Sequence, residues 1–368
     1  MKKLKDYSED IYKCTKCGLC QAVCPIFQET GLETSVSRGK FTLLNGIVNG
    51  HIKFNKNIGK YLEMCLGCRA CFEFCPSGIN AEEIINAARA EYAERYGVNI
   101  IKKIILVILK HCRRILPASL IRSFTSHLFT VNSVHSTVQD DKRAKIIYFP
   151  GCFDTSTKAV KMVLEKNGFD VHIPKGFSCC GMAAKSAGDM NTFTKLMQNN
   201  ISKIPADIDF IITECASCGS AWQEYPKHIA KKVVNIYKFL NDIDLYIPKN
   251  ASYNKTVTWH DPCHLVRFQQ IAQEPRNILR EIPGLTFVEM EEADKCCGAA
   301  GTFCVTKPLI SLPISRKKAL NIINTGADAV ATSCSGCKIG ITQGLLSLKT
   351  IKPIVSPVHI LADIYSQE

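Results

Sequence analysis

The amino-acid sequence predicts a multi-domain chain, in which an α-helical, cysteine-rich N-terminal domain is followed by two homologous α/β domains. Two observations lead to this prediction. Eight of the 20 cysteines form two runs of identical spacing within the first 80 residues, and four blocks of the later sequence recur in the same order about 115 residues further on. A chain of 368 residues is long enough for several domains with their own cores. We expect the helical domain at 1–98, a basic helical linker at 99–144, and the α/β domains at 145–250 and 251–368.

The two N-terminal runs share the pattern C-x2-C-x2-C-x3-C-P, which ends at Pro25 in the first run and at Pro76 in the second. This spacing resembles that of bacterial ferredoxins with two [4Fe–4S] clusters, in which three closely spaced thiolates bind one cluster and the fourth reaches the other. The resemblance predicts two sets of ligands: Cys14, Cys17, Cys20 and Cys75 for one cluster, and Cys65, Cys68, Cys71 and Cys24 for the other.

Forty residues separate the two runs, more than a compact bacterial ferredoxin needs. We expect helices in this insertion, similar to the α-helical ferredoxins that are fused to dehydrogenase subunits. After the second run, Asn80 followed by Glu83 is typical of a helix start, and Ile84, Ala88 and Tyr92 recur every four residues. This pattern predicts a helix that packs one face against the clusters.

The cysteine content also indicates a compartment. The first residues contain no apolar segment typical of a signal peptide, and no apolar run approaches the roughly 18 residues that span a bilayer. In a secreted protein, 20 cysteines would suggest disulfides, whereas cytosolic thiols stay reduced. We therefore expect a cytoplasmic protein that uses its cysteines to bind metal.

Positive charge is concentrated in the linker, where the stretch 99–145 holds nine basic and two acidic residues. Nucleic-acid-binding surfaces usually combine such charge with aromatic side chains. Phe124 and Phe129 are the only Phe, Tyr or Trp residues of this stretch, so we expect no nucleic-acid partner.

Residues 100–116 contain no acidic residue and have the pattern of a basic amphipathic helix. The basic residues fall on one side, where Leu106 is the apolar exception; they are Lys102, Lys103, Lys110, Arg113 and Arg114. Two interpretations remain open. The segment is either a linker helix that docks on its own protein with a solvated basic face, or a peripheral contact with the inner face of the cell membrane.

The repeated blocks begin with a β-rich run that ends on a cysteine, Cys152 in the first copy and Cys263 in the second. A Cys-Cys-Gly triplet, a second apolar run that ends on C-x2-C, and a final helical block follow in both copies. A period this long indicates two homologous domains, because solenoid repeats are far shorter. The alternation of short apolar runs with helical stretches predicts a mostly parallel sheet, with the cysteines at its carboxyl edge.

Each copy supplies five cysteines to this edge. They are Cys152, Cys179, Cys180, Cys215 and Cys218 in the first copy, and Cys263, Cys296, Cys297, Cys334 and Cys337 in the second. Five thiolates exceed what zinc takes, and an excess of soft thiolates favours iron–sulfur chemistry. We also expect Gly181 and Gly298, which follow the paired cysteines, to let the backbone approach a bulky cluster.

The duplicated C…CCG…C-x2-C pattern resembles the CCG domains of the iron–sulfur subunit family. Members of this family include the iron–sulfur subunits of glycolate oxidase, D-lactate dehydrogenases and anaerobic glycerol-3-phosphate dehydrogenase. The family is related to subunits B/C or D of heterodisulfide reductase. The segments 37–40 and 260–265 also resemble this family. The resemblance implies one or two further [4Fe–4S] clusters of the noncubane type in the CCG domains.

The two copies differ in spacing. The second has 32 residues between Cys263 and Cys296, close to the heterodisulfide reductase pattern, whereas the first has only 26 between Cys152 and Cys179. A cluster is therefore better supported in the second copy. His260 and His264 flank Cys263, and we name His264 as the cofactor-binding histidine.

The expected function is that of an oxidoreductase subunit in which electron transfer, rather than substrate turnover, takes place on this chain. We expect no catalytic side chain. The resemblance implies an FAD-containing dehydrogenase partner that oxidises a 2-hydroxy acid, such as glycolate or lactate, or glycerol 3-phosphate, and a quinone or other electron acceptor. The alternative is a catalytic subunit that reduces a thiol disulfide at the CCG-domain clusters. The sequence leaves open the substrate, the donor and acceptor, the cluster potentials and the oligomeric state.

Overall fold

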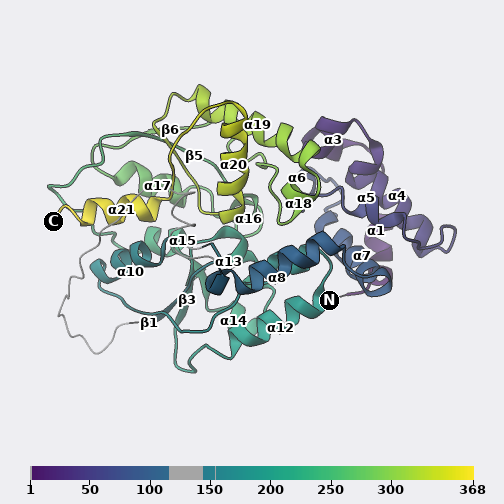
Figure 1. The fold of residues 1–368 in the computed structure, drawn as a ribbon, viewed down its shortest axis with the longest axis horizontal. Helices are drawn as coiled ribbons and strands as arrows, with labels where there is room; N and C mark the ends of the chain where they lie inside the picture. Colours follow the sequence, from purple (N-terminus) through teal and green to yellow (C-terminus); the bar gives the residue numbers. More distant parts are fainter. Residues whose placement is uncertain (1, 116–143, 154) are drawn as a thin grey trace.

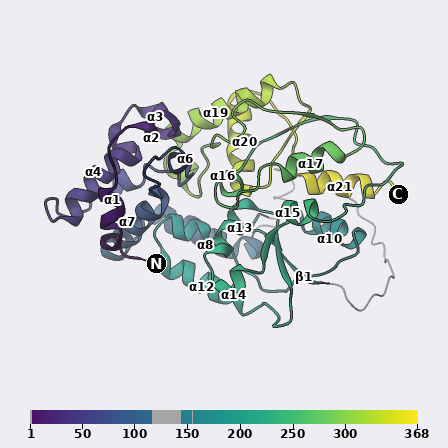
Figure 2. The same cartoon turned by 180° about the vertical axis from the view of Figure 1, so that it is seen from behind.

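The computed structural model describes residues 2–115, 144–153 and 155–368, with only the backbone for 110–115. The expected linker at 99–144 therefore lies partly outside the described residues. The helical unit occupies one end of the molecule, and helices α10 and α21 lie toward the opposite end (Figures 1 and 2).

The described part of the first 98 residues contains helices and no strand. Its elements are η1 (Leu4–Tyr7), α1 (Ser8–Tyr12), α2 (Leu19–Val23), α3 (Pro25–Thr30), η2 (Glu33–Ser35), α4 (Ser37–Val48), α5 (Ile58–Leu62), α6 (Ala70–Glu73) and α7 (Ala81–Tyr96). Ile84 and Ala88 of α7 are buried in the core of this unit, and Tyr92 packs at its edge. The four-residue spacing thus marks the inward face of α7, as expected for an amphipathic helix.

The first α/β unit contains one four-stranded parallel sheet, with strand order β2-β1-β3-β4. Its elements are β1 (Lys145–Phe149), α10 (Thr157–Lys166), β2 (Asp170–His172), α11 (Met182–Ser186), α12 (Met190–Ile201), β3 (Phe210–Thr213), α13 (Ala216–Gln223), α14 (Lys227–Ala230), β4 (Val233–Asn235) and α15 (Ile236–Asn241). The central strands β1 and β3 are almost completely buried, as is usual for parallel strands covered on both faces.

The second α/β unit repeats this topology with strand order β6-β5-β7-β8. Its elements are β5 (Thr256–Trp259), α16 (Cys263–Val266), α17 (Glu274–Glu281), β6 (Thr286–Val288), α18 (Phe303–Thr306), α19 (Pro308–Asn324), β7 (Ala329–Ala331), α20 (Ser335–Ser347), β8 (Ile354–Val355) and α21 (Pro357–Tyr365). The equal strand order supports the internal repeat that the sequence predicts.

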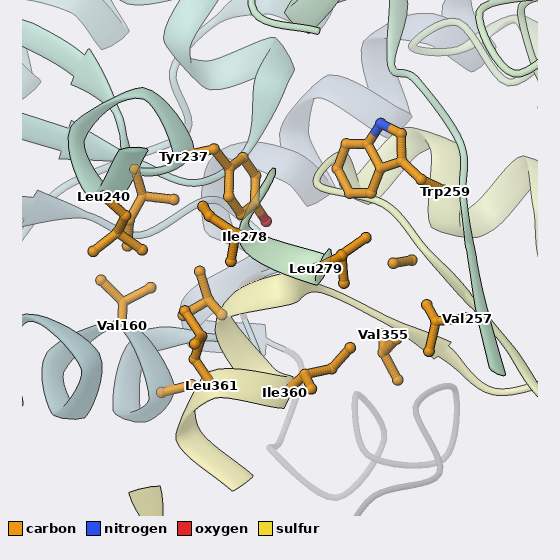
Figure 3. Packing of buried hydrophobic residues seen from close by; sticks show 14 of the residues in the cluster. Val160, Tyr237, Leu240, Val257, Trp259, Ile278, Leu279, Val355, Ile360 and Leu361 are labelled. Carbon is orange, nitrogen blue, oxygen red and sulfur yellow. The ribbon is translucent and has the colours of Figure 1, made fainter. Parts of the chain in front are cut away.

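The two α/β units share one continuous hydrophobic core (Figure 3). Helix α21 of the second unit packs on α10 of the first, and α15 of the first packs on α17 of the second. The side chains at this junction include Val160, Leu240, Ile278 and Leu361, all fully buried. Burying a side chain of this size contributes about 1.5–3 kcal/mol, so each unit depends on the other for part of its stability.

The helical unit packs against both α/β units. Helix α3 contacts α19, where Ile26 meets Phe303 and Ile314, and α7 contacts α11. The glycine at position 188 is needed here, because a Cβ atom would lie 2.3 Å from the carbonyl oxygen of Arg89 in α7. These contacts bring the N-terminal cysteines close to those of the second α/β unit.

Helix α8 (Ile100–Ile115) docks with a different face from the one expected. Lys102 is buried and its ammonium contacts the Glu63 carboxylate at 2.8 Å, while Leu106 packs into the core of the first α/β unit. The expectation of a wholly solvated basic face is therefore wrong at Lys102, because Glu63 draws this charge inward. Lys110, Arg113 and Arg114 have no described side chains, and residue 116 lies outside the described residues.

The outward side of α8 is apolar. Its exposed apolar residues are Ile100, Ile101, Ile104, Val107 and Ile108, and Lys103 is exposed beside them. Within the described ranges, no helix combines the length and the hydropathy needed to cross a membrane.

Candidate metal centres

Site 1 comprises Cys14, Cys17, Cys20 and Cys75, which line one hollow in the helical unit. The structure thus brings the last cysteine of the second run beside the three closely spaced cysteines of the first. Lys16 and Gly18 have positive φ angles of 59° and 88°, which turn the backbone around the hollow. Cys17 is exposed, so site 1 opens at the surface.

Site 2 comprises Cys24, Cys65, Cys68 and Cys71, which line a neighbouring hollow. Gly67 and Arg69 repeat the positive φ angles of the first run, at 65° and 59°. The hydroxyl of Ser37 donates a hydrogen bond to the Cys71 sulfur at 3.1 Å, and the Gly67 N–H lies 3.4 Å from the Cys65 sulfur. Donors aimed at sulfur favour bound thiolates, so the local chemistry fits an iron–sulfur cluster.

The start of α4 supports both sites. Arg38 donates a hydrogen bond to the Lys16 carbonyl at 3.2 Å and pairs with Glu33, which fixes the loop of site 1. Gly39 is required by close packing, because a Cβ atom would lie 2.1 Å from the Glu33 carbonyl oxygen. Lys40 is 1% exposed and its ammonium donates to the Thr34 carbonyl at 3.2 Å.

Burial lowers the pKa of Lys40, and the nearby thiols of Cys65 and Cys24 oppose that shift. A buried cation costs free energy unless negative charge lies close by. Thiolates held by a cluster at site 2 would supply that charge, which is a second observation that fits the group.

Site 3 comprises the five cysteines of the first α/β unit. Cys152 follows β1 and Cys215 follows β3, so both lie at the carboxyl edge of the sheet, as expected. The five thiols lie close enough for neighbours to shift one another's pKa, in the order Cys152, Cys179, Cys180, Cys218, Cys215. Hydrogen bonds from Cys152 and then Cys180 lower the pKa of Cys179 well below its usual range.

Site 4 comprises the five cysteines of the second α/β unit, arranged in the same way. The thiols are connected in the order Cys263, Cys296, Cys297, Cys337, Cys334. Hydrogen bonds from Cys296 and then Cys337 lower the pKa of Cys297 well below its usual range. Five converging thiols again exceed the four ligands of a structural zinc site, so both sites fit an iron–sulfur group better than zinc.

Sites 3 and 4 touch each other. The thiols of Cys215 and Cys334 lie close enough to shift each other's pKa, and the Ser217 hydroxyl lies 3.2 Å from the Cys334 sulfur. A backbone hydrogen bond of 3.2 Å from Ala216 to Ser333 joins the two units at this point. The ten cysteines of the α/β units therefore form one continuous sulfur-lined region.

Sites 2 and 4 are also neighbours. Burial raises the pKa of Cys68 well above its usual range, and the nearby thiols of Cys296 and Cys263 add to the shift. Arg267 crosses this boundary and contacts the Glu73 carboxylate at 2.7 Å. Beside it, the Arg69 guanidinium lies 3.7 Å from the centre of the Phe268 ring. The two contacts hold the helical unit against site 4.

His264, the histidine named from the sequence, lies at the junction of sites 3 and 4. Its Nδ1 is 2.8 Å from the Ser217 hydroxyl, and its ring packs edge-on against Phe268. Burial lowers the pKa of His264 to about 4, so the ring is neutral near pH 7. His264 thus contacts a residue that contacts the Cys334 sulfur.

His260, the other histidine that flanks Cys263, lies beside two sulfurs of site 4. Its ring nitrogen and the sulfurs of Cys297 and Cys337 all lie within 4.8 Å of one another. Burial lowers the pKa of His260 to about 3. The sequence alone distinguishes His260 in one way: the matching residue in the first copy is Phe149, so the histidine is specific to the second copy.

The glycines after the paired cysteines also lie against neighbouring helices. Gly181 and Gly298 both have positive φ angles, of 89° and 81°. A Cβ atom at Gly181 would meet the Phe193 ring at 2.6 Å, and one at Gly298 would meet the Ser311 carbonyl oxygen at 2.9 Å. The crowding at these positions comes from neighbouring helices, so glycine is required by the left-handed backbone and by helix packing.

Comparison with known proteins gives two family matches. The model of a 4Fe-4S dicluster domain matches residues 10–79, and the model of the CCG cysteine-rich domain matches residues 146–222 and 257–342. A subunit of the fumarate reductase (CoM/CoB) from Methanothermobacter marburgensis is 31% identical, over 93% of this chain and 70% of that protein. The chain belongs to the CCG-domain iron–sulfur subunit family.

Two further relatives of this CCG-domain protein are matched over nearly their whole length. A probable glycolate oxidase iron-sulfur subunit from Bacillus subtilis is 28% identical over 96% of this chain and 93% of its own. A subunit of the dihydromethanophenazine:CoB–CoM heterodisulfide reductase from Methanosarcina acetivorans is 27% identical over 92% and 90%. The family matches confirm the prediction of [4Fe–4S] cofactors, because a 4Fe-4S dicluster domain is followed by cysteine-rich CCG domains.

Proposed function

We propose that this CCG-domain protein is the iron–sulfur electron-transfer subunit of a flavin-linked dehydrogenase complex. In this proposal, the cysteines of sites 1 and 2 bind one [4Fe–4S] cluster each. Sites 4 and 3 each bind a further [4Fe–4S] cluster of the noncubane type. These clusters supply one-electron transfer, and the chain fixes their positions and surroundings.

The observation that supports this function is the contiguity of the four sites. Cys71 and Ser37 line both site 1 and site 2. Cys68 of site 2 lies near Cys296 of site 4, and Cys334 of site 4 contacts Cys215 of site 3. The order of the sites in space is therefore 1, 2, 4, 3, without a gap, which is the arrangement that an electron path requires.

We infer that the partner protein docks over site 1. This site has the exposed Cys17, and the exposed side chains Leu19 and Phe74 line its hollow. Exposed apolar groups beside a functional site are typical of a protein interface. The partner in this proposal is an FAD-containing dehydrogenase that oxidises glycolate, lactate or glycerol 3-phosphate, and a quinone or other acceptor takes the electrons. The resemblance to the probable glycolate oxidase subunit supports this choice.

The experiment is anaerobic purification of the complex from its own cells, followed by flavin, iron and sulfide analysis. Glycolate, lactate and glycerol 3-phosphate are then added in turn while the cluster absorbance is recorded. We expect one substrate to bleach the clusters only when the flavin-containing partner is present. Bleaching of the isolated iron-loaded chain by any of the three would contradict the proposal, because it would place substrate oxidation on this chain.

A second candidate function is disulfide reduction, and one feature favours it. A polar hollow lies beside Cys215 at the junction of the α/β units, lined by Glu214, Ser333, Ser335 and Lys338 among others. A disulfide that reached the mouth of this hollow would lie next to Cys215 of site 3 and beside Ser333 and Ser335, which flank Cys334 of site 4. Reduction of such a heterodisulfide by the isolated, pre-reduced chain would favour this function, and a chain that stays reduced in its presence would exclude it.

The proposed membrane contact rests on α8. Its outward side is apolar, Lys103 beside it is exposed, and no described residue of the helix is acidic. These are the features of a helix that lies in the interface of an anionic bilayer.

A flotation assay with vesicles that contain phosphatidylserine tests this contact. Ile104→Gln with Ile108→Gln is expected to abolish binding. Leu309→Gln with Ile351→Gln, which changes two exposed apolar residues elsewhere, is expected to leave it unchanged. Equal binding of both double variants would exclude α8 as the contact.

A further inference from the structure

We propose that His260 Nε2 is a nitrogen ligand to iron in site 4, beside the thiolates of Cys297 and Cys337, and that site 3 has no such ligand. The inference rests on the proposed function, because it assumes an iron–sulfur cluster in site 4. It adds a histidine nitrogen to the five thiols of this site.

The position of His260 is fixed by the sheet. The residue directly follows β5, and its backbone N–H donates to the Ala331 carbonyl of β7 at 2.9 Å. The side chain is 1% exposed, and its ring lies within 4.8 Å of the Cys297 and Cys337 sulfurs. The imidazole therefore points into the same space as two of the five thiols.

The orientation of the ring is also fixed. Nδ1 lies 3.1 Å from the Ala293 carbonyl oxygen, which can only accept, so Nδ1 carries the proton. The same oxygen accepts from the Asp261 backbone N–H at 3.0 Å and from the Lys318 ammonium at 3.3 Å, so its own position is held from two further sides. A histidine that ligates a metal typically donates its other N–H to a carbonyl in this way.

Nε2 is left as a bare acceptor. It is buried and has no hydrogen-bond partner among the described residues. An unsatisfied buried polar atom costs about 1–3 kcal/mol. Neither sulfur donates to Nε2 in the metal-free chain, and thiolates and sulfides of a bound cluster are acceptors that offer it no proton. A positive centre between Nε2 and the two sulfurs would stabilise this arrangement. An iron ion bound by Cys297 and Cys337 would supply that centre.

Other groups near the ring do not satisfy Nε2. Lys318 is 2% exposed and donates to the carbonyls of Glu292 and Ala293. Asp261 is fully engaged, because it accepts from the Trp259 indole at 2.6 Å and pairs with Arg276. Both charges thus have partners of their own, and neither satisfies Nε2.

Site 3 cannot bind a cluster in this way. The matching residue in the repeat alignment is Phe149, whose ring packs edge-on against Phe177 and Trp222 at centroid distances of 5.0 and 4.9 Å. A neutral imidazole adds no negative charge to iron, in contrast to a thiolate, and histidine ligation is known to raise cluster potentials. Where His260 takes the place of a thiolate at one iron, we therefore expect site 4 to be reduced more readily than site 3.

The test uses the full chain, loaded anaerobically with iron and sulfide and labelled with [15N]histidine. Pulsed EPR is recorded on the paramagnetic species that Cys296→Ser abolishes, which assigns the species to site 4. We expect a nitrogen hyperfine coupling that scales with the isotope. The coupling should disappear in His260→Asn, whose amide keeps a hydrogen-bond donor near the Nδ1 position. The iron content of this variant should fall by fewer than the four atoms of one cluster. His228→Asn, a change at an exposed histidine, should keep the coupling.

Two results would overturn the inference while leaving the proposed function intact. One is a site 4 species without any histidine nitrogen coupling in the unmodified chain, a measurement that requires no variant to fold. The other is a coupling that persists in His260→Asn. If instead no species is lost in Cys296→Ser, site 4 holds no cluster, and the proposed function fails at this site together with the inference.

Discussion

The two α/β units have the same strand order and five connected thiols each, yet they surround those thiols with different side chains. Around site 3 the wall is aromatic, and Tyr225 and Asn200 donate to the backbone carbonyls of Cys180 and Cys179 at 3.0 and 3.1 Å. Around site 4 the neighbours are His260 and the buried Lys318, and Ser315 donates to the Cys297 carbonyl at 2.8 Å.

This difference shows that a repeat can retain its sulfur ligands while the surrounding layer changes. The layer controls the electrostatics and the water access of a metal site, and therefore its potential. Two sites of equal sulfur count are consequently expected to differ in their place on an electron path.

The largest expected effect comes from removing one paired cysteine from each site in turn. Cys297→Ser and Cys180→Ser occupy matching positions of the repeat, and each should cost its own site about four iron atoms per chain while the other site remains loaded. Anaerobic iron and sulfide analysis with EPR measures both. If either variant lost the species of both sites, the two sites would have to be treated as one joint centre, since Cys215 contacts Cys334.

An intermediate effect is expected from giving site 3 the histidine of site 4. Phe149→His introduces a buried polar group without a partner, so the metal-free chain should lose about 1–3 kcal/mol of unfolding free energy. In the iron-loaded chain the loss should be smaller, because the imidazole then faces a metal. Thermal unfolding of both states measures the difference.

The matched control for this exchange is Phe239→His, which lies in α15 and packs on Phe169 and Phe210. It should destabilise both states equally. An equal loss for Phe149→His in the two states would argue against a metal within reach of that position.

The smallest expected effect is on the pH dependence of stability, and it concerns two aspartates at matching positions of the repeat. Burial raises the pKa of Asp363 to about 6, whereas Asp242 is exposed and pairs with Lys238. An aspartate in the unfolded chain titrates near 3.9. Unfolding therefore releases a proton between about pH 4 and pH 6, so the free energy of unfolding contributed by Asp363 falls as pH rises through this window.

Asp363→Asn removes this penalty. The variant should raise the melting temperature of the anaerobic protein at pH 7 and leave it nearly unchanged at pH 4. Asp242→Asn should have little effect at either pH. A fall in melting temperature at pH 7 for Asp363→Asn would show that the carboxylate makes a stabilising contact.

Much of this arrangement could be predicted from the sequence, because cysteine spacing and repeated blocks are local patterns. The spacing grouped Cys75 with Cys14, and the repeat located the edges of both sheets. The contact of Cys215 with Cys334 could not be predicted, since it depends on how two units pack. The inward face of α8 was missed for the same reason, because Lys102 is drawn in by Glu63, 39 residues earlier in the chain. His260 was visible beside Cys263, but only the sheet shows where its ring points.

The packing of helices across the two α/β units also has a consequence for folding during translation. Helix α10 is covered by α21, which is translated about 200 residues later. The first unit therefore leaves the ribosome with an apolar surface that stays uncovered until the second unit has been made. Such surfaces favour misassembly in proteins of several domains. We expect chaperone binding to this surface during translation.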